Sequence, residues 1–103
     1  MPNFVFAYHG GGKPETPEAG EKAMAAWSKW FQDMGDQVIE PGHPVGMSRT
    51  VSADGVADHG GSNPLSGISI VRADDHDAAV ELAKGCPILA DGGTVEVAEA
   101  MQM

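Results

Sequence analysis

One pattern of apolar and polar positions occurs twice along the chain: a short apolar run, a stretch with helical spacing, and a second β-prone run. Residues 3–8 predict the first strand because aromatic and aliphatic side chains dominate them. A helix follows, with Thr16 as N-cap, Pro17 at its first position and Gly35 as its C-terminal stop. Its apolar positions recur every three or four residues and form one stripe, made of Ala23, Met24, Trp27, Trp30, Phe31 and Met34.

The middle of the chain predicts a strand, a hairpin and a loop. Residues 37–40 favour a strand that is broken at Pro41, because proline removes a backbone donor. Two short β-prone runs, 48–52 and 56–57, flank an Asp-Gly step, which is a strong signal for a hairpin turn. Glycine, serine, asparagine and proline then dominate residues 59–66, which predicts a loop.

The second copy of the pattern fills the rest of the chain. The β-branched run 67–73 suits a central strand. Asp75 is the expected N-cap of a second helix, which Gly85 ends. Residues 94–98 alternate as a strand with one wet face, and residues 99–103 are expected to form a short tail.

This order of elements predicts an α+β fold, the ferredoxin-like split βαβ sandwich, as one domain over residues 1–103. Both helices would cover one face of an antiparallel sheet and leave the other face open. Neither face of the first strand is polar, since alternation sends Phe4, Phe6 and Tyr8 one way and Val5, Ala7 and His9 the other. An uncovered apolar face implies a partner, and the economical partner is a second copy in a sheet-to-sheet homodimer.

Composition and charge narrow the classes of function. Apolar residues form 42% and charged residues 20% of the chain, as in ordinary globular domains. The formal charge of −9 disfavours nucleic-acid binding, and no run is long enough to cross a bilayer. Cys86 is the single cysteine, so an internal disulfide is excluded and a reducing cytoplasm is expected.

The ordered motifs resemble those of the YCII-related proteins, also called DGPF-domain proteins, of the dimeric α/β-barrel superfamily. The motifs run from Phe6-Ala7-Tyr8-His9 through the hairpin to Asp58, then Ser66-Gly67, Asp74-Asp75, Ala83-Lys84-Gly85-Cys86-Pro87 and Gly93-Thr94-Val95-Glu96-Val97. The four residues that give the DGPF branch its name differ in this chain, where they are Asp58-His59-Gly60-Gly61. The resemblance implies a protomer that dimerises through its sheet and has a small-molecule cleft.

His9 with Asp58 is the main candidate for catalysis. An imidazole can move protons near neutral pH, and a carboxylate that accepts its ring N–H fixes the tautomer. The competing interpretation is a strand-end histidine that is merely hydrogen-bonded to a loop. The expected substrate-binding residues of the cleft are Tyr8, His43, His59 and Ser66, although a surface position is the simpler interpretation of His43 and His59.

The residues give less support to metal, cofactor or thiol chemistry. The four histidines follow no zinc-ligand spacing, and the three glycines after His9 lack the spacing of a phosphate loop, so neither a metal nor a cofactor is predicted. Cys86 is typical of a small buried residue, His76 of a surface residue, and the two tryptophans of a core. We expect cofactor-independent proton transfer, elimination or isomerisation of a small molecule. The alternatives are a non-catalytic ligand-binding or regulatory module and a purely structural protein.

Overall fold

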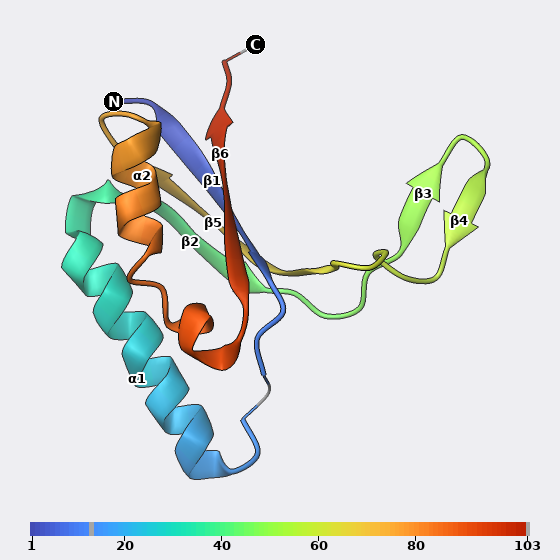
Figure 1. The fold of residues 1–103 in the computed structure, drawn as a ribbon, viewed down its shortest axis with the longest axis horizontal. Coiled ribbons are helices and arrows are strands. Elements are labelled where there is room, and N and C mark those ends of the chain that lie inside the picture. The colour runs from blue at the N-terminus through green and yellow to red at the C-terminus, as the bar shows by residue number, and fades with distance from the viewer. Residues whose placement is uncertain (13, 103) are drawn as a thin grey trace.

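The computed structural model describes residues 1–12 and 14–102. Its strands are β1 (Asn3–His9), β2 (Val38–Pro44), β3 (Thr50–Ser52), β4 (Gly55–Ala57), β5 (Leu65–Arg72) and β6 (Thr94–Ala100). Its helices are α1 (Pro17–Met34) and α2 (His76–Ala83), with short 3-10 helices η1 (Gly35–Gln37) and η2 (Pro87–Asp91). Figure 1 shows one layer of helices beside one sheet, with the β3–β4 hairpin standing apart.

The main sheet has the strand order β2-β5-β1-β6, and every neighbouring pair is antiparallel. The predicted α+β class, with an antiparallel sheet and two helices, is therefore confirmed. The order is compatible with the ferredoxin-like plan, because the two strands that follow a helix, β2 and β6, lie at the sheet edges.

Both helices begin where the sequence predicts, because each N-cap side chain accepts a backbone N–H of the first turn. The Thr16 hydroxyl accepts from the Ala19 amide at 3.1 Å, and the Asp75 carboxylate accepts from the Ala78 amide at 2.8 Å. Gly35 ends α1 with a φ of 57°, and its amide donates to the Phe31 carbonyl. These caps satisfy groups that a helix end leaves without intrahelical partners.

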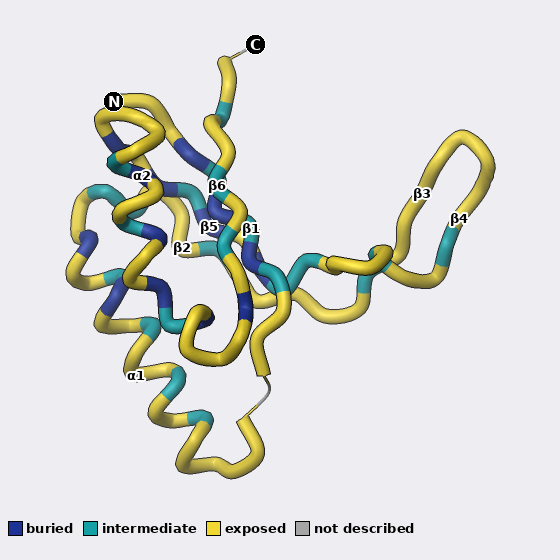
Figure 2. Tube along the Cα trace, viewed as in Figure 1, coloured by how far each residue is buried: buried dark blue, intermediate teal, exposed yellow. Residues whose placement is uncertain are grey.

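The core lies between the helices and one face of the sheet, and Figure 2 shows buried residues gathered there. Every second residue of β1 is buried, and the Phe6 ring stacks on Trp30 with 6.0 Å between ring centroids. The Trp30 indole N–H also donates to the Leu82 carbonyl at 3.1 Å, which ties α1 to α2. The predicted role of Trp30 in the core is confirmed.

The edge strand β2 differs from the prediction, because it continues through Pro41 to Pro44. An edge strand can accommodate proline, since one side of its backbone has no partner strand. The register against β5 shifts twice, and Gly42 takes a φ of 74° within this irregular stretch. The Ser69 hydroxyl donates to the Pro41 carbonyl at 2.6 Å and holds the strand to its neighbour.

Two further boundaries extend beyond the prediction. β5 begins at Leu65, inside the segment expected to be a loop, and β6 continues to Ala100, inside the expected tail. Both extensions pair with β1, opposite His9 and Asn3 respectively. Long-range pairing therefore decides these ends, and local composition does not reveal it.

Candidate functional site

His9 is the last residue of β1 and lies on the face of the sheet that neither helix covers. Alternation places Phe4, Phe6 and Tyr8 in the core, so the side chains of Val5, Ala7 and His9 lie on the opposite face, called here the open face. On β6, Glu96 is directly opposite Ala7 and therefore shares this face with His9.

Protein acceptors hold both nitrogens of the His9 ring. Nδ1 lies 3.0 Å from the Asn63 carbonyl oxygen and 3.2 Å from that of Pro64, while Nε2 lies 3.1 Å from Glu96 Oε1. A carbonyl can only accept, so Nδ1 carries a proton and donates it. Nε2 lies within hydrogen-bond distance of the Glu96 carboxyl, so the ring bridges two backbone carbonyls and one acidic side chain.

Exposure differs sharply between the two members of this pair. The His9 side chain is 11% exposed and that of Glu96 is 67% exposed. A molecule that approaches the open face therefore meets the carboxylate first, with the imidazole fixed behind it. The geometry holds the His9 ring in place and leaves the Glu96 carboxyl exposed to solvent.

The predicted pairing of His9 with Asp58 is not formed within the chain. Asp58 follows β4 and binds Arg49 across the base of the hairpin, with 3.2 Å between Asp58 Oδ1 and Arg49 Nη2. Its side chain is 86% exposed. Glu96 takes the place at His9 that the sequence assigned to Asp58, because the β1–β6 register brings Glu96 to the same face.

The predicted substrate-binding residues lie in different places. Tyr8 is in the core, where its hydroxyl donates to Ser69 Oγ at 2.8 Å and burial raises its pKa above the usual value. Ser66 Oγ donates to the Gly10 carbonyl at 2.8 Å and so holds the loop that follows His9. Ser66 is the one member of this group that directly shapes the surroundings of His9.

The two remaining candidates are histidines on exposed backbone. His43 is opposite Ile68 in the β2–β5 pairing and is exposed at the edge of the sheet. His59 follows the hairpin, and its Nδ1 accepts the Gly61 amide at 3.0 Å. Neither makes a hydrogen bond to His9 or Glu96.

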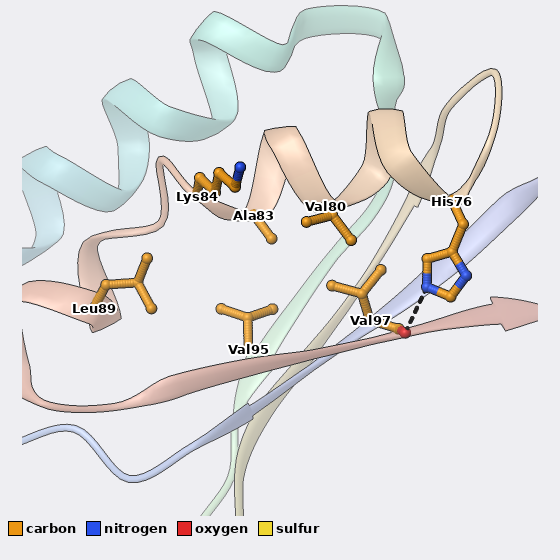
Figure 3. Close-up of a pocket in the computed structure, with 7 residues that line it drawn as sticks. All are labelled: His76, Val80, Ala83, Lys84, Leu89, Val95 and Val97. Carbon is orange, nitrogen blue, oxygen red and sulfur yellow. Dashed lines mark hydrogen bonds between the residues drawn. The ribbon is translucent and has the colours of Figure 1, made fainter.

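Two cavities in the described part of the chain lie away from His9. One, of about 340 Å³, opens between α2 and β6, and Figure 3 shows Val80, Val95 and Val97 among its lining residues. His76 also lines it and donates from Nε2 to the Val97 carbonyl at 3.0 Å, so this histidine covers part of the exposed edge of β6. The other, of about 430 Å³, lies where the loop after β1 enters α1.

Cys86 is buried at 3% exposure beside the core, and burial raises the pKa of its thiol to about 11. Such a thiol is a poor nucleophile at neutral pH, in line with its predicted role as a small buried residue.

Among residues 1–12 and 14–102, no three His, Cys, Asp or Glu side chains gather as a metal site. Within the same residues, neither helix has the length and apolar character needed to cross a membrane.

Glu96 is the site residue that the sequence interpretation missed. The alternation over residues 94–98 does predict a wet face that includes Glu96. It does not reveal that this face is shared with His9, because that depends on which residues of β1 and β6 are opposite one another.

Comparison with known proteins adds no family to this geometry: no family model, curated protein or solved structure matches the chain. The resemblance to YCII-related proteins remains a prediction from the sequence.

Proposed function

We propose that the protein is a homodimer of ferredoxin-like protomers, and that His9 and Glu96 form a proton-transfer site for a small carbonyl compound. One observation carries the proposal: Nε2 of His9 and Oε1 of Glu96 lie 3.1 Å apart on the open face, with Nδ1 of His9 fixed by two backbone carbonyls. A fixed imidazole that shares a proton with an accessible carboxylate is an arrangement suited to general acid–base catalysis.

The chemistry needs no electron carrier. The Glu96 carboxylate takes a proton from the carbon next to the substrate carbonyl, and the electron pair of that C–H bond moves towards the carbonyl oxygen. The Nε2–H of His9 donates a hydrogen bond to that oxygen as negative charge develops there. Return of the proton from Glu96 to a different carbon gives isomerisation, whereas departure of a leaving group with the electron pair gives elimination.

The second copy supplies the wall that this site needs. The open face carries Val5, Ala7, Ile68 and Ile70 in addition to His9, and Ile68 is 39% exposed. Apolar side chains at the centre of a sheet are normally covered, and a second copy of the chain can cover them. We place the dimer in the cytoplasm, where the single cysteine stays reduced.

The proposal is tested by following proton exchange in D₂O. A panel of β,γ-unsaturated and β-halogenated ketones is incubated with the protein, and ¹H NMR follows the loss of the signal next to the carbonyl. We expect Glu96→Gln and His9→Gln each to slow exchange by about 100-fold, a typical contribution of a positioned acid or base. Glu99→Gln is the matched control, because Glu99 is on the same strand but is opposite Phe4 on the other face.

The outcome against the proposal is equally concrete. Exchange by the wild type that is no faster than exchange by Glu96→Gln for every ketone of the panel would remove the catalytic role.

The same contacts also favour a second function, ligand binding without turnover. Both ring nitrogens of His9 already have protein acceptors, so the ring is held in place without a substrate. The same NMR samples distinguish the two functions. Ketones that shift the Glu96 side-chain resonances without losing their own protons indicate a binding module.

A further inference from the structure

The β3–β4 hairpin, called here the arm, has no partner strand within the part of the chain that the structure describes. Its two strands of three residues form a sheet of their own, and Figure 1 shows them standing clear of the main sheet. Its base is closed by the Arg49–Asp58 pair and by the Thr50 hydroxyl, which donates to the His59 carbonyl at 2.7 Å. An isolated two-stranded hairpin is only marginally stable in water, so a surface that contacts the arm would stabilise it.

One face of the arm is apolar. Val51 and Val56 are directly opposite one another, so their side chains lie on the same face, and they are 77% and 55% exposed. Met47, in the segment that leads into the arm, is 94% exposed. Cross-strand pairs of β-branched residues stabilise a sheet when a third surface covers them, and no described residue of the same chain does so here.

The exposed surface is larger than that of a compact monomer of this mass by more than one partner's share of a standard interface. The accessible surface is 7200 Å², whereas a monomeric protein of this mass exposes about 5,500 Å². The difference is about 1,700 Å², and a standard stable interface needs about 800 Å² from each partner. The radius of gyration, 14.8 Å, also exceeds the value of about 13 Å for a compact domain of this length.

The arm starts and ends beside the His9 site. Asn63 and Pro64, which hold the His9 ring, belong to the segment that returns from the arm to β5. On the outgoing side, the Val45 amide donates to the Ser66 carbonyl at 2.9 Å. Any contact that orders the arm therefore also fixes the backbone carbonyls that orient His9.

We propose that each arm packs on a second copy of this chain, with its Val51–Val56 face against the open face of the partner beside the partner's His9 site. Both contacting surfaces are apolar. Ile68 is exposed on the open face and lies opposite Ala7, and Ala7 is next to His9 on the same face. The partner's arm then walls a site that one chain leaves open. This inference extends the proposed function, since it names what encloses the His9–Glu96 pair.

Cross-linking between two variants that each carry one introduced cysteine tests the contact directly. Chains carrying Val51→Cys are mixed with mass-tagged chains carrying Ile68→Cys, and a short bis-maleimide is added. Cys86 is buried and remains unmodified in the folded chain. We expect a mixed cross-linked dimer, and we expect none when Ile68→Cys is replaced by Val80→Cys, an exposed position on α2.

Sedimentation measures how much the arm contributes to assembly. We expect the wild type to be a dimer and Val51→Asp/Val56→Asp to raise the dimer dissociation constant at least tenfold, with Met24→Asp, at an exposed position on α1, as the control that leaves it unchanged. All three positions are exposed, so the substitutions leave the fold of the protomer intact, which circular dichroism checks.

The outcomes separate this inference from the proposed function. A monomeric wild type, or a dimer that forms normally with both aspartates and gives no mixed cross-link, overturns the arm contact whatever the ketone experiment shows. A mixed cross-link together with no proton exchange supports the arm contact and contradicts the catalytic role.

Discussion

Nε2 of His9 and Oε1 of Glu96 lie 3.1 Å apart, although 87 positions separate the two residues in the chain. They meet because β1 and β6 are adjacent and antiparallel, which puts Glu96 opposite Ala7 and on the same face as His9. Two backbone carbonyls fix the other nitrogen of the ring. The carboxylate is much more exposed than the imidazole, so the pair presents Glu96 to solvent and keeps His9 behind it.

Replacing this carboxylate is expected to change the environment of the His9 ring, whereas replacing Asp58 is not. In Glu96→Gln the neutral amide cannot share a proton with Nε2, so the ¹⁵N resonance of Nε2 shifts while that of Nδ1, held by carbonyls, moves little. Long-range ¹H–¹⁵N correlation spectra of the histidine rings measure both. A larger effect of Asp58→Asn on Nε2 would show that Asp58 reaches His9 across subunits and would contradict our assignment.

The buried chain from Tyr8 through Ser69 to Pro41 predicts that two similar substitutions differ in effect. Tyr8→Phe removes one donor and leaves the Ser69 hydroxyl bonded to the Pro41 carbonyl, so we expect a loss of about 1 kcal/mol in the free energy of unfolding. Ser69→Ala leaves the buried Tyr8 hydroxyl without its acceptor, and the expected loss is about 2 kcal/mol.

Urea denaturation of both variants measures this difference. Equal losses would mean that water replaces Ser69 as the partner of the Tyr8 hydroxyl. Thr50→Ala is a suitable control, because its hydroxyl bond at the base of the arm is exposed.

Much of the fold is predictable because its signals are local. A cap residue, a periodic stripe and a terminating glycine are close in sequence, and they locate α1 and the start of α2 correctly. Even the Asp-Gly turn of the arm follows from two adjacent residues. The predicted end of β2 was wrong. Pro41 is unfavourable in an average strand, but this strand lies at the sheet edge and bulges.

The candidate site is less predictable because it depends on register. The position of His9 at a strand end follows from the sequence, but its partner depends on which carboxylate the sheet places beside it. Asp58 and Glu96 both carry a carboxylate, so residue type alone cannot distinguish Glu96 from the predicted Asp58. Only the pairing of β1 with β6 distinguishes them, and a shift of one residue would turn Glu96 to the other face.

The irregular edge strand predicts strong sensitivity at Gly42. This residue has a φ of 74°, and a Cβ there would collide with the Ile68 carbonyl oxygen. We expect Gly42→Ala to reduce the free energy of unfolding by about 2 kcal/mol or more. Gly46→Ala is the matched control, because a Cβ at that position meets open space. Chemical denaturation compares the two variants, and equal stabilities would show that β2 relaxes without cost.

Cys86 predicts how stability depends on pH in the alkaline range. Burial raises the pKa of its thiol from 9.0 to about 11. Below pH 9 both the folded and the unfolded chain keep the proton, and the contribution of the thiol to stability is fully present. Between pH 9 and 11 the unfolded chain loses its proton first, so the free energy of unfolding falls as pH rises.

The size of this fall in the free energy of unfolding follows from the pKa shift of Cys86, and the Cys86→Ala variant isolates it. At pH 10.5 we expect the wild type to have lost about 2 kcal/mol relative to pH 8 because of this one thiol. The variant lacks that loss but retains every other titrating group, including Tyr8. Guanidinium denaturation of both proteins at the two pH values gives the difference, whatever the alanine does to stability at pH 8. Parallel pH dependences of the two proteins would mean that the thiol ionises in the folded state as readily as in the unfolded chain.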